Sequence, residues 1–318
     1  MIKRRICMLG GTGFVGRQIA ERLYRDGHEV TILTRRRERH RDLLVVPTVR
    51  LVDADIHNPA VLRREFAGHD VAINLVGILN ERGHSGRGFA RVHAELPEKV
   101  VEACRASGIQ RLLHMSALHA ALNAPSHYLR TKALGEETVH RAHGGDLAVT
   151  SFRCSVIFGP RDGFTNRFAQ LLRLVPGLFP LACPDARFQP VYVDDVAAAF
   201  VHALDDHQTF GQRYDLCGPK VYRLRELVEY IASLIGRRVH IIELNDMLSH
   251  LQAAIMEFAP GKPFSLDNYR SLQIDSVCSK GFPAVFGITL RTLESVAAGW
   301  LNPHDADRFA PLRGIAGR

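Results

Sequence analysis

The sequence predicts an α/β protein built on a doubly wound parallel sheet, with a smaller, mostly helical C-terminal domain. First, short apolar runs alternate with amphipathic stretches of helical periodicity from the beginning of the chain to Gly159. Second, glycines stand three residues apart between the first apolar run and the first helical stretch. Third, the alternation loosens after Gly159. Such alternation favours right-handed crossovers and helices on both faces of the sheet.

The predicted strands are short and mostly apolar, as strands buried on both faces should be. They cover residues 5–9, 27–35, 49–56, 69–79, 109–117 and 147–159. The predicted helices cover residues 14–26, 58–68, 89–108 and 127–143. Pro59 suits a helix start and Ser126 an N-cap, whereas Pro97 is expected to perturb the third helix.

The same alternation sets the expected domain boundaries. Residues 1–159 and 188–218 are assigned to the sheet domain, because a strand and a helix pattern return near residues 190 and 200. Residues 160–187 and 219–318 are assigned to a small domain for a substrate or partner. Within it, residues 164–182 are apolar with interspersed arginines. This favours a core helix, with a lid or a membrane-facing segment as the alternative.

Composition and charge narrow the class of protein. The 318 residues carry a net charge of +8, and only six of the 41 basic residues are lysine. An anionic ligand, an acidic protein partner or an anionic membrane surface would fit this charge, as would a bias of the source genome. The arginines are scattered without interleaved aromatic residues, which disfavours nucleic acid.

The apolar segments and the cysteine spacing predict the cellular location of the protein. No apolar run is long enough for a transmembrane segment, and no signal peptide is expected. The six cysteines are far apart and form no CxxC pair, so we expect mostly buried, reduced thiols. No metal-binding spacing is present, and no metal site is predicted. We therefore expect a cytoplasmic protein, peripheral to the inner membrane if it meets a membrane at all.

The glycine-rich turn predicts a dinucleotide site. Gly10 permits a tight turn, Gly13 lets the backbone approach a pyrophosphate, and Gly16 lets the helix pack on the strand. The helix beginning at residue 14 would offer its unpaired N–H groups and its dipole to the phosphates. The other cofactor-binding residues expected in this turn are Thr12, Phe14 and Val15.

The arginines after the second predicted strand indicate which dinucleotide binds. An acidic residue there would bind the ribose hydroxyls of NAD, but the strand ends in Thr34, followed by Arg35 and Arg36. Two guanidinium groups can bind a 2′-phosphate. NADP(H) is therefore favoured, and NAD(H) remains open. Asp55, after the third strand, is placed either to contact the adenine end or to cap the next helix.

Three polar residues predict a catalytic site. Tyr128 and Lys132 are four residues apart on one helical face, and Ser116 ends the preceding strand. A tyrosine hydroxyl can donate a proton to a carbonyl that receives hydride, and a nearby ammonium is expected to lower the pKa of that tyrosine below its usual value of about 10. The serine hydroxyl would hold the substrate oxygen.

These motifs resemble the short-chain dehydrogenase/reductase superfamily of extended type. The resemblance rests on "GGTGFVG" (10–16), the Ser116, Tyr128 and Lys132 set, and "QPVYVDDVA" (189–197). The stretches "NLVGIL", "SHYLRTKALGEETV", "SVIFGPRDGFTNRF" and "PFSLDNYRSLQIDSV" resemble an atypical subgroup that includes the NADPH-binding accessory subunit of mitochondrial complex I and its bacterial relatives. The resemblance covers nearly the whole chain and implies a Rossmann-type fold with bound NADP(H).

The resemblance also implies further site residues. Cofactor contacts are expected from Asn74, Leu75 and Gly77, and Lys132 is expected to hold the nicotinamide ribose as well as to tune the tyrosine. Cys154 stands where the family usually has proline, at a backbone contact with the nicotinamide amide. This departure puts the local rigidity of that contact in doubt.

Two classes of function follow and stay open. The first is an NADP-dependent oxidoreductase that transfers hydride to or from a small or hydrophobic carbonyl or a quinone-like substrate. The second is a non-catalytic, cofactor-holding structural or regulatory subunit of the kind associated with a respiratory complex, docked on a protein partner or a membrane-complex surface. The region 116–128 lacks the acidic residues of sugar-nucleotide dehydratases. This disfavours dehydration and makes nucleotide-sugar epimerisation less favoured.

Overall fold

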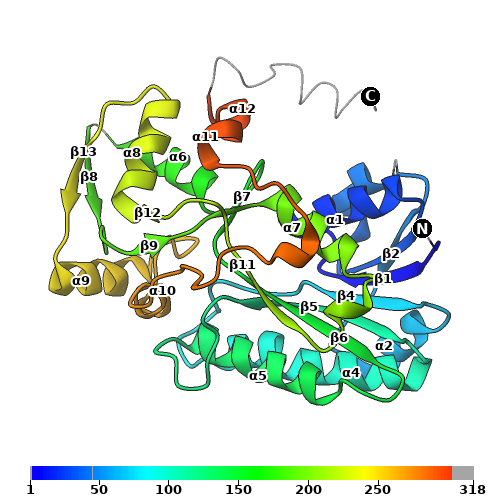
Figure 1. Cartoon of the computed structure of the whole chain (residues 1–318). Coiled ribbons are helices and arrows are strands. Elements are labelled where there is room, and N and C mark those ends of the chain that lie inside the picture. The colour runs from blue at the N-terminus through cyan, green and yellow to red at the C-terminus, as the bar shows by residue number, and fades with distance from the viewer. Residues whose placement is uncertain (1, 45, 176, 303–318) are drawn as a thin grey trace. The chain divides into compact units, whose positions relative to one another are not determined.

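The structure is a computed structural model that describes residues 2–44, 46–175 and 177–302 (Figure 1). The chain forms two compact units, each made of several stretches of sequence. The first unit contains the chain up to Cys154, with Val193–Asp215 and Pro283–Ile288. The second unit contains Ser155–Tyr192, Leu216–Phe282 and the chain from Thr289 onward. Residues 303–318, assigned by sequence to the small domain, lie outside the described residues.

A seven-stranded sheet organises the first unit. Its strands are β1 (Arg5–Leu9), β2 (Glu29–Thr34), β3 (Val49–Asp53), β4 (Val71–Asn74), β5 (Arg111–Ala117), β6 (Ala148–Cys154) and β11 (Arg213–Leu216). Their order is β11-β6-β5-β4-β1-β2-β3, and the contacts from β3 to β6 are all parallel. This order reverses between β1 and β4, as in a Rossmann fold, and confirms the predicted fold class.

Helices cover both faces of this sheet (Figure 1). On one face, α1 (Phe14–Arg25) packs against α7 (Val193–His202). On the other, α4 (Leu96–Ser107) packs against α2 (Pro59–Phe66) and α5 (His127–Arg141). The remaining elements of the unit are α3 (Arg87–Ala90) and the short helices η1 (Arg37–Leu43), η2 (Arg91–Glu95), η3 (His207–Thr209) and η4 (Ala284–Phe286). Across the described residues, no helix has both the length and the apolar character needed to cross a membrane.

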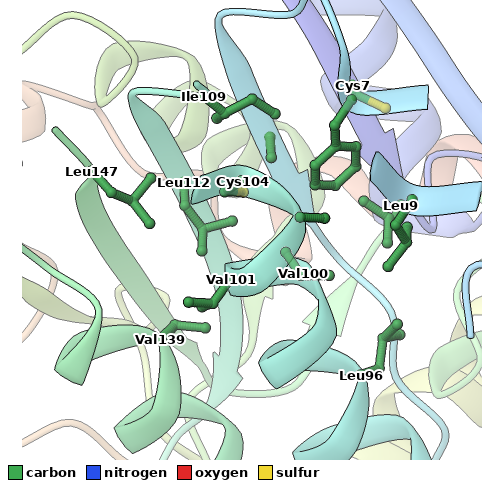
Figure 2. Packing of buried hydrophobic residues seen from close by; sticks show 14 of the residues in the cluster. Cys7, Leu9, Leu96, Val100, Val101, Cys104, Ile109, Leu112, Val139 and Leu147 are labelled. Carbon is green, nitrogen blue, oxygen red and sulfur yellow. The ribbon is translucent and has the colours of Figure 1, made fainter. Parts of the chain in front are cut away.

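The core beneath the sheet is made from the apolar residues that the alternation predicted (Figure 2). Leu9 and Leu112 lie on strands, and Val100 and Cys104 lie on α4. All four are fully buried. Burying each such side chain contributes about 1.5–3 kcal/mol, so this layer holds α4 against the sheet.

The predicted effect of Pro97 is visible as a change of helix type. The segment η2 is a π-helix, and Pro97 lies in the first turn of α4 directly after it. Proline has no N–H and its ring clashes with the carbonyl four residues earlier, so the wider π turn accommodates it. The same helix ends at Gly108, which has the left-handed conformation that glycine adopts easily.

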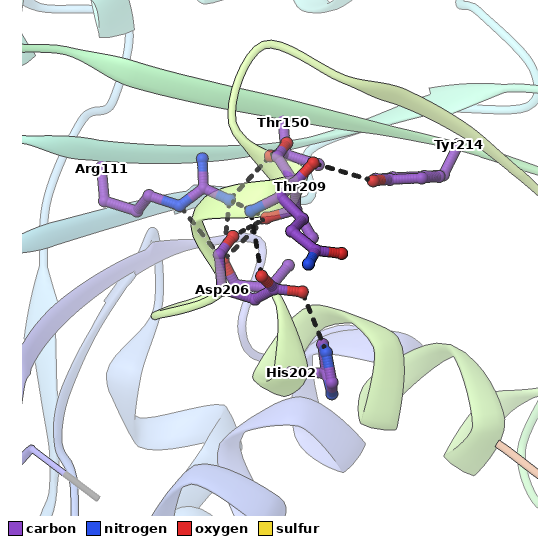
Figure 3. Close-up of polar contacts among 8 residues, drawn as sticks. Arg111, Thr150, His202, Asp206, Thr209 and Tyr214 are labelled. Carbon is purple, nitrogen blue, oxygen red and sulfur yellow. Dashed lines mark hydrogen bonds and ion pairs between the residues drawn. The ribbon is translucent and has the colours of Figure 1, made fainter. Parts of the chain in front are cut away.

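A buried arginine ties together the amino ends of β5 and β6 (Figure 3). The Arg111 guanidinium donates to the Thr150 hydroxyl at 2.6 Å, the Thr209 hydroxyl at 3.0 Å and the Ala203 carbonyl at 2.7 Å. These groups come from β6, η3 and the end of α7. The sheet edge and the chain that returns to it are therefore fixed at the end of the sheet opposite the glycine turn.

The second unit has its own core and short sheets. Its strands are β7 (Ile157–Phe158), β8 (Leu178–Leu181), β9 (Arg187–Phe188), β10 (Val191–Tyr192), β12 (Tyr222–Arg223) and β13 (His240–Glu243). Its helices are α6 (Thr165–Leu174), α8 (Leu224–Leu234), α9 (Asp246–Met256), α10 (Leu266–Ser271), α11 (Leu293–Val296) and α12 (Ala298–Leu301). Phe158, Leu172, Leu227 and Ile231 are fully buried in its core. Helix α6 contributes to that core, as the core helix favoured by the sequence within 164–182 would do.

The structure differs from the expected boundaries and from the expected thiols. β7 and β10 pair with each other instead of extending the large sheet, so residues 155–159 and 188–192 belong to the second unit. Cys217 and Cys278 form a disulfide, which corrects the prediction of reduced thiols at these two positions. The pairing joins residues 61 apart in sequence that only the fold brings together. Cys7, Cys104, Cys154 and Cys183 are free thiols.

Candidate functional site

The glycine turn has the geometry that its sequence predicts. Gly10 has φ +79°, which favours glycine, and a Cβ there would lie 3.0 Å from the carbonyl carbon of Leu75. A Cβ on Gly16 would lie 2.5 Å from the Gly10 oxygen, so helix α1 packs on the turn as closely as glycine allows. The exposed Gly13 differs, because a Cβ there would meet only the Gly10 oxygen at 3.2 Å.

The amino end of α1 fits a pyrophosphate. Gly13 is its N-cap, and no side chain caps the first turn in the described structure. The N–H groups of Phe14 and Val15 therefore stand at a helix end with the positive dipole and open space beyond Gly13. The Thr12 carbonyl accepts a hydrogen bond from Arg17 Nε at 3.0 Å, which holds the turn against the helix.

The predicted cations lie at the carboxyl end of β2. Arg35 and Arg36 are exposed, and neither forms an ion pair within the described residues. The Arg36 N–H donates to the Thr34 hydroxyl at 3.4 Å. Asp55 is exposed after β3, and its carboxylate accepts the His57 N–H at 3.0 Å. The cap of the next helix is Asn58 and not Asp55, so the helix-cap interpretation of Asp55 is wrong, and its contact with the adenine end stays a prediction.

The chain leaving β4 runs directly beside the glycine turn. The Leu75 N–H donates to the Leu9 carbonyl at 3.0 Å, after which the chain leaves the sheet. Asn74 is buried: its amide oxygen accepts the Val76 N–H at 3.2 Å, and its nitrogen lies 3.3 Å from His114 Nδ1. These contacts fix the loop after β4 at the point where the strand order reverses.

Helix α5 brings Lys132 to the same edge. Ser126 caps the helix by accepting the Leu129 N–H, as the sequence predicted. Lys132 is 5% exposed, and its Nζ donates to the Met115 carbonyl at the end of β5 at 3.0 Å. A Cβ on Gly77 would lie 3.3 Å from that nitrogen. The structure therefore places the ammonium between the loop after β4 and the end of β5.

Tyr128 lies one turn before Lys132 and packs edge-on against two rings. Its ring centroid is 5.4 Å from that of His93 and 6.2 Å from that of Phe89. Burial, reinforced by Cys154, raises the pKa of Tyr128, so the expected lowering by Lys132 is wrong for this structure. Burial also lowers the pKa of Lys132 to about 8. The phenol is therefore protonated at neutral pH.

Ser116 ends β5 as predicted, but its hydroxyl has a different partner from the expected one. It donates to the Glu136 carboxylate at 2.5 Å. Glu136 is 1% exposed and also binds Arg153 at 2.7 Å and Arg213 at 2.9 Å. The serine hydrogen is therefore committed to a buried ion network, and its catalytic role stays a prediction.

Sequence reasoning did not single out His93, which connects the parts of this site. Its Nε2 accepts the Ile78 N–H at 3.0 Å, so Nδ1 carries the hydrogen and donates to the Thr131 hydroxyl at 3.2 Å. Burial, and then the charge of Lys132, lowers the pKa of His93 to about 2. The sequence signal that could have identified His93 is its position as a polar residue within an apolar helical pattern, just before Pro97.

Two other residues complete the edge. Cys154 ends β6 opposite Ala117 and is buried, which raises the pKa of its thiol to about 12. Glu136 was also missed, although Tyr128, Lys132 and Glu136 follow one another at four-residue steps on α5. Among the side chains described here, no group of three His, Cys, Asp or Glu could hold a metal ion.

Known proteins resemble this chain over most of its length. The NAD dependent epimerase/dehydratase family matches residues 6–217. An Arabidopsis thaliana protein, NADH dehydrogenase [ubiquinone] 1 alpha subcomplex subunit 9, mitochondrial, is 31% identical over 283 residues, covering 85% of this chain and 68% of the relative. A Caulobacter vibrioides ceramide reductase is 28% identical over 324 residues, covering 93% and 96%.

A solved structure shares the fold. The UDP-glucuronic acid 4-epimerase of Bacillus cereus, crystallised in complex with UDP-glucuronic acid and NAD, superimposes with a TM-score of 0.66. The alignment covers 76% of this chain and 86% of the epimerase at 18% identity. The family match includes the glycine turn, the end of β4 and the Tyr128 helix. The chain therefore belongs to the NAD-dependent epimerase/dehydratase family, with an NAD(P)-binding Rossmann fold of the extended short-chain dehydrogenase/reductase type.

Proposed function

We propose that the protein is an NADP(H)-dependent reductase that delivers hydride to the carbonyl of a hydrophobic, lipid-like substrate, with Tyr128 as proton donor. The observation that carries this proposal is the Lys132 ammonium, buried and held at the Met115 carbonyl beside Gly77. A buried lysine is costly without a function, and here it lies one helical turn from Tyr128, which is half-buried.

The residues at the carboxyl ends of the strands fit the cofactor. Gly10, Gly13 and Gly16 would hold the pyrophosphate at the α1 amino end, and Arg35 and Arg36 would bind a 2′-phosphate. The loop of Asn74, Leu75 and Gly77, together with Cys154, would line the nicotinamide side. The bound dinucleotide supplies the hydride.

The protonation state of Tyr128 supports the reductive direction. Because its pKa is raised, the phenol holds its proton at neutral pH and can donate it from Oη to a carbonyl oxygen that gains negative charge. The reverse reaction needs tyrosinate, which is disfavoured until high pH. The Lys132 ammonium would hold the nicotinamide ribose, and the Ser116 oxygen can still accept a hydrogen bond.

The reductase relative supports the substrate class. Ceramide reductase aligns over 96% of its own length, so the likeness includes both units of this chain. A carbonyl next to long alkyl chains is the substrate class that such a likeness suggests. We propose a cytoplasmic location, peripheral to the inner membrane, as the place where such a substrate would be met.

A second possible function, that of a non-catalytic subunit that holds the cofactor, also has support. The relatives include a mitochondrial NADH dehydrogenase subunit, and the Ser116 hydrogen is committed to Glu136. In this alternative the same glycine turn and Lys132 would retain NADP(H) as a structural ligand. Its partner would be a protein of a membrane-bound respiratory assembly.

One experiment separates the two functions. NADPH oxidation is measured with a panel of ketosphingoid, 3-oxoacyl, aldehyde and quinone compounds for wild type, Tyr128→Phe and the control Tyr24→Phe. Tyr24 is on the exposed side of α1, so the same hydroxyl is removed away from the site. A reductase should lose about 10²–10⁴-fold of its rate in Tyr128→Phe and nothing in Tyr24→Phe.

The opposite outcomes are equally clear. Equal turnover by wild type and Tyr128→Phe would exclude the tyrosine as proton donor. Retention of NADPH without oxidation on any compound would favour the cofactor-holding subunit.

A further inference from the structure

Helix α9 presents its largest apolar side chains to solvent. The α9 face consists of Met247, Leu248, Leu251, Ile255 and Phe258, in the helix or the turn that continues it. Met247 is 73% exposed, Ile255 65% and Phe258 80%. Their spacing places all five on one side of the helix. Exposed apolar residues are normal singly, whereas a continuous stripe indicates a surface that binds something.

The opposite side of α9 shows that this exposure is a property of the helix. Ser249 and Ala253 are fully buried, and the Ser249 hydroxyl donates to the Leu244 carbonyl at 3.2 Å. A helix of a soluble protein normally buries its large apolar residues and exposes small or polar ones. In α9 the arrangement is reversed, because the inner side is packed closely with small residues.

The apolar surface continues onto the neighbouring sheet of the same unit. Gln252 donates to the Pro180 carbonyl at 3.1 Å, which places α9 beside β8. Leu178 on β8 is 58% exposed, and Ile242 on β13 pairs opposite Pro180 and is 42% exposed. The α9 face is therefore part of a wider apolar surface of the second unit.

Arginines without acidic partners lie at both ends of this surface. Arg167 binds the Gly261 carbonyl just beyond α9, and Arg237 binds the Arg173 carbonyl at the end of α6. The neighbouring Arg238 is similar. Within the described ranges, the guanidinium groups of Arg167, Arg237 and Arg238 form no ion pair.

The acidic groups nearby are already engaged. Glu243 pairs with Arg225, and Asp246 accepts the Tyr269 hydroxyl at 2.6 Å. Glu257 is buried, 3.8 Å from Lys262. Within the described ranges, Arg167, Arg237 and Arg238 are therefore left without an acidic partner at this surface.

We propose that the α9 face docks on an anionic phospholipid surface. An apolar helical stripe flanked by unpaired arginines is what an interfacial helix needs, because the apolar side chains enter the acyl boundary while the guanidinium groups meet lipid phosphates. A second copy fits poorly, since a symmetric contact would oppose arginine to arginine. The proposal does not depend on turnover or on the cofactor.

The test is flotation of the full chain with vesicles. Vesicles of phosphatidylcholine and phosphatidylglycerol in equal parts are compared with pure phosphatidylcholine. The variant Leu251→Gln/Ile255→Gln/Phe258→Gln should reduce partitioning to the anionic vesicles by about tenfold for each side chain, 1.4 kcal/mol each. Leu122→Gln is the control, because Leu122 is 59% exposed in the first unit. It should bind like wild type.

A charge variant keeps the test decisive if the apolar variant folds poorly. Arg237→Gln/Arg238→Gln leaves the apolar stripe intact and should lower anionic binding about fivefold for each arginine, and added salt should reduce wild-type binding likewise. Failure of wild type to float with anionic vesicles would overturn the proposal. So would unchanged binding by the apolar variant, or a loss of dimers in that variant without a change in vesicle binding.

Discussion

Replacing Lys132 with methionine should stabilise the cofactor-free protein. Burial lowers the pKa of Lys132 from 10.5 to about 8, so at neutral pH the fold carries a charge that it disfavours. At about 1.4 kcal/mol for each pH unit, this amounts to about 3 kcal/mol. The variant also loses the hydrogen bond to the Met115 carbonyl, and this loss lowers the free energy of unfolding by about 1 kcal/mol. Lys132→Met should therefore raise the free energy of unfolding by about 2 kcal/mol at pH 7.

The pH dependence identifies the cause. Between pH 8 and 10.5 the unfolded state keeps the Lys132 proton and the folded state loses it, so wild-type stability contains a part that rises with pH over this range. The Lys132→Met protein lacks this pH-dependent contribution to its free energy of unfolding. The difference between the two proteins should be largest below pH 8 and should shrink toward pH 10.5.

Urea unfolding of the cofactor-free proteins at several pH values between 7 and 10 measures this difference. Lys280→Met is the control, because Lys280 is exposed and should change little at any pH. A Lys132→Met protein less stable than wild type at pH 7, or a difference that does not change with pH, would refute the reasoning. The same variant should bind NADPH more weakly, because the site loses its ammonium.

Three further outcomes are expected. Gly16→Ala should lower the free energy of unfolding by about 1–3 kcal/mol in urea, since its Cβ would lie 2.5 Å from the Gly10 oxygen; stability equal to wild type would contradict the close packing. In fluorescence titrations, wild type should bind NADPH at least about tenfold more tightly than NADH, and Arg35→Ala/Arg36→Ala should remove this preference. Equal wild-type affinities for the two dinucleotides would exclude binding of the 2′-phosphate by these arginines. Glu136→Gln should cost about 3 kcal/mol by thermal unfolding, because two arginines lose a buried carboxylate, and a neutral effect would show that the network is dispensable.

The parts of the fold that could be predicted from sequence depend on local rules. Strand and helix periodicity predicted the order of elements. Ser126 and Gly108 occupy the cap positions, and Pro59 the first helical position, that their chemistry favours. Strand lengths were less predictable. The run 69–79 is mostly apolar, but β4 is limited to Val71–Asn74 because the chain leaves the sheet after pairing with Leu9.

The site shows the same limit at the level of side chains. The sequence placed Ser116 at the end of a strand and Lys132 on the facing helix, but the partner of each depends on contacts across the fold. Glu136 takes the Ser116 hydrogen, and Lys132 reaches the Met115 carbonyl. The raised pKa of Tyr128 follows from the depth of burial, which a four-residue spacing does not contain.

The strand order has a consequence for synthesis of the chain. β6 ends at Cys154, but the strand that covers its outer edge, β11, begins at Arg213, about 60 residues later. At 5–20 residues per second, a ribosome needs roughly 3–12 s to make that stretch. During this interval the hydrogen-bonding edge of β6 is bare and able to pair with another nascent chain. Expression yield should therefore depend on how quickly translation passes this interval and on chaperones that cover exposed strand edges.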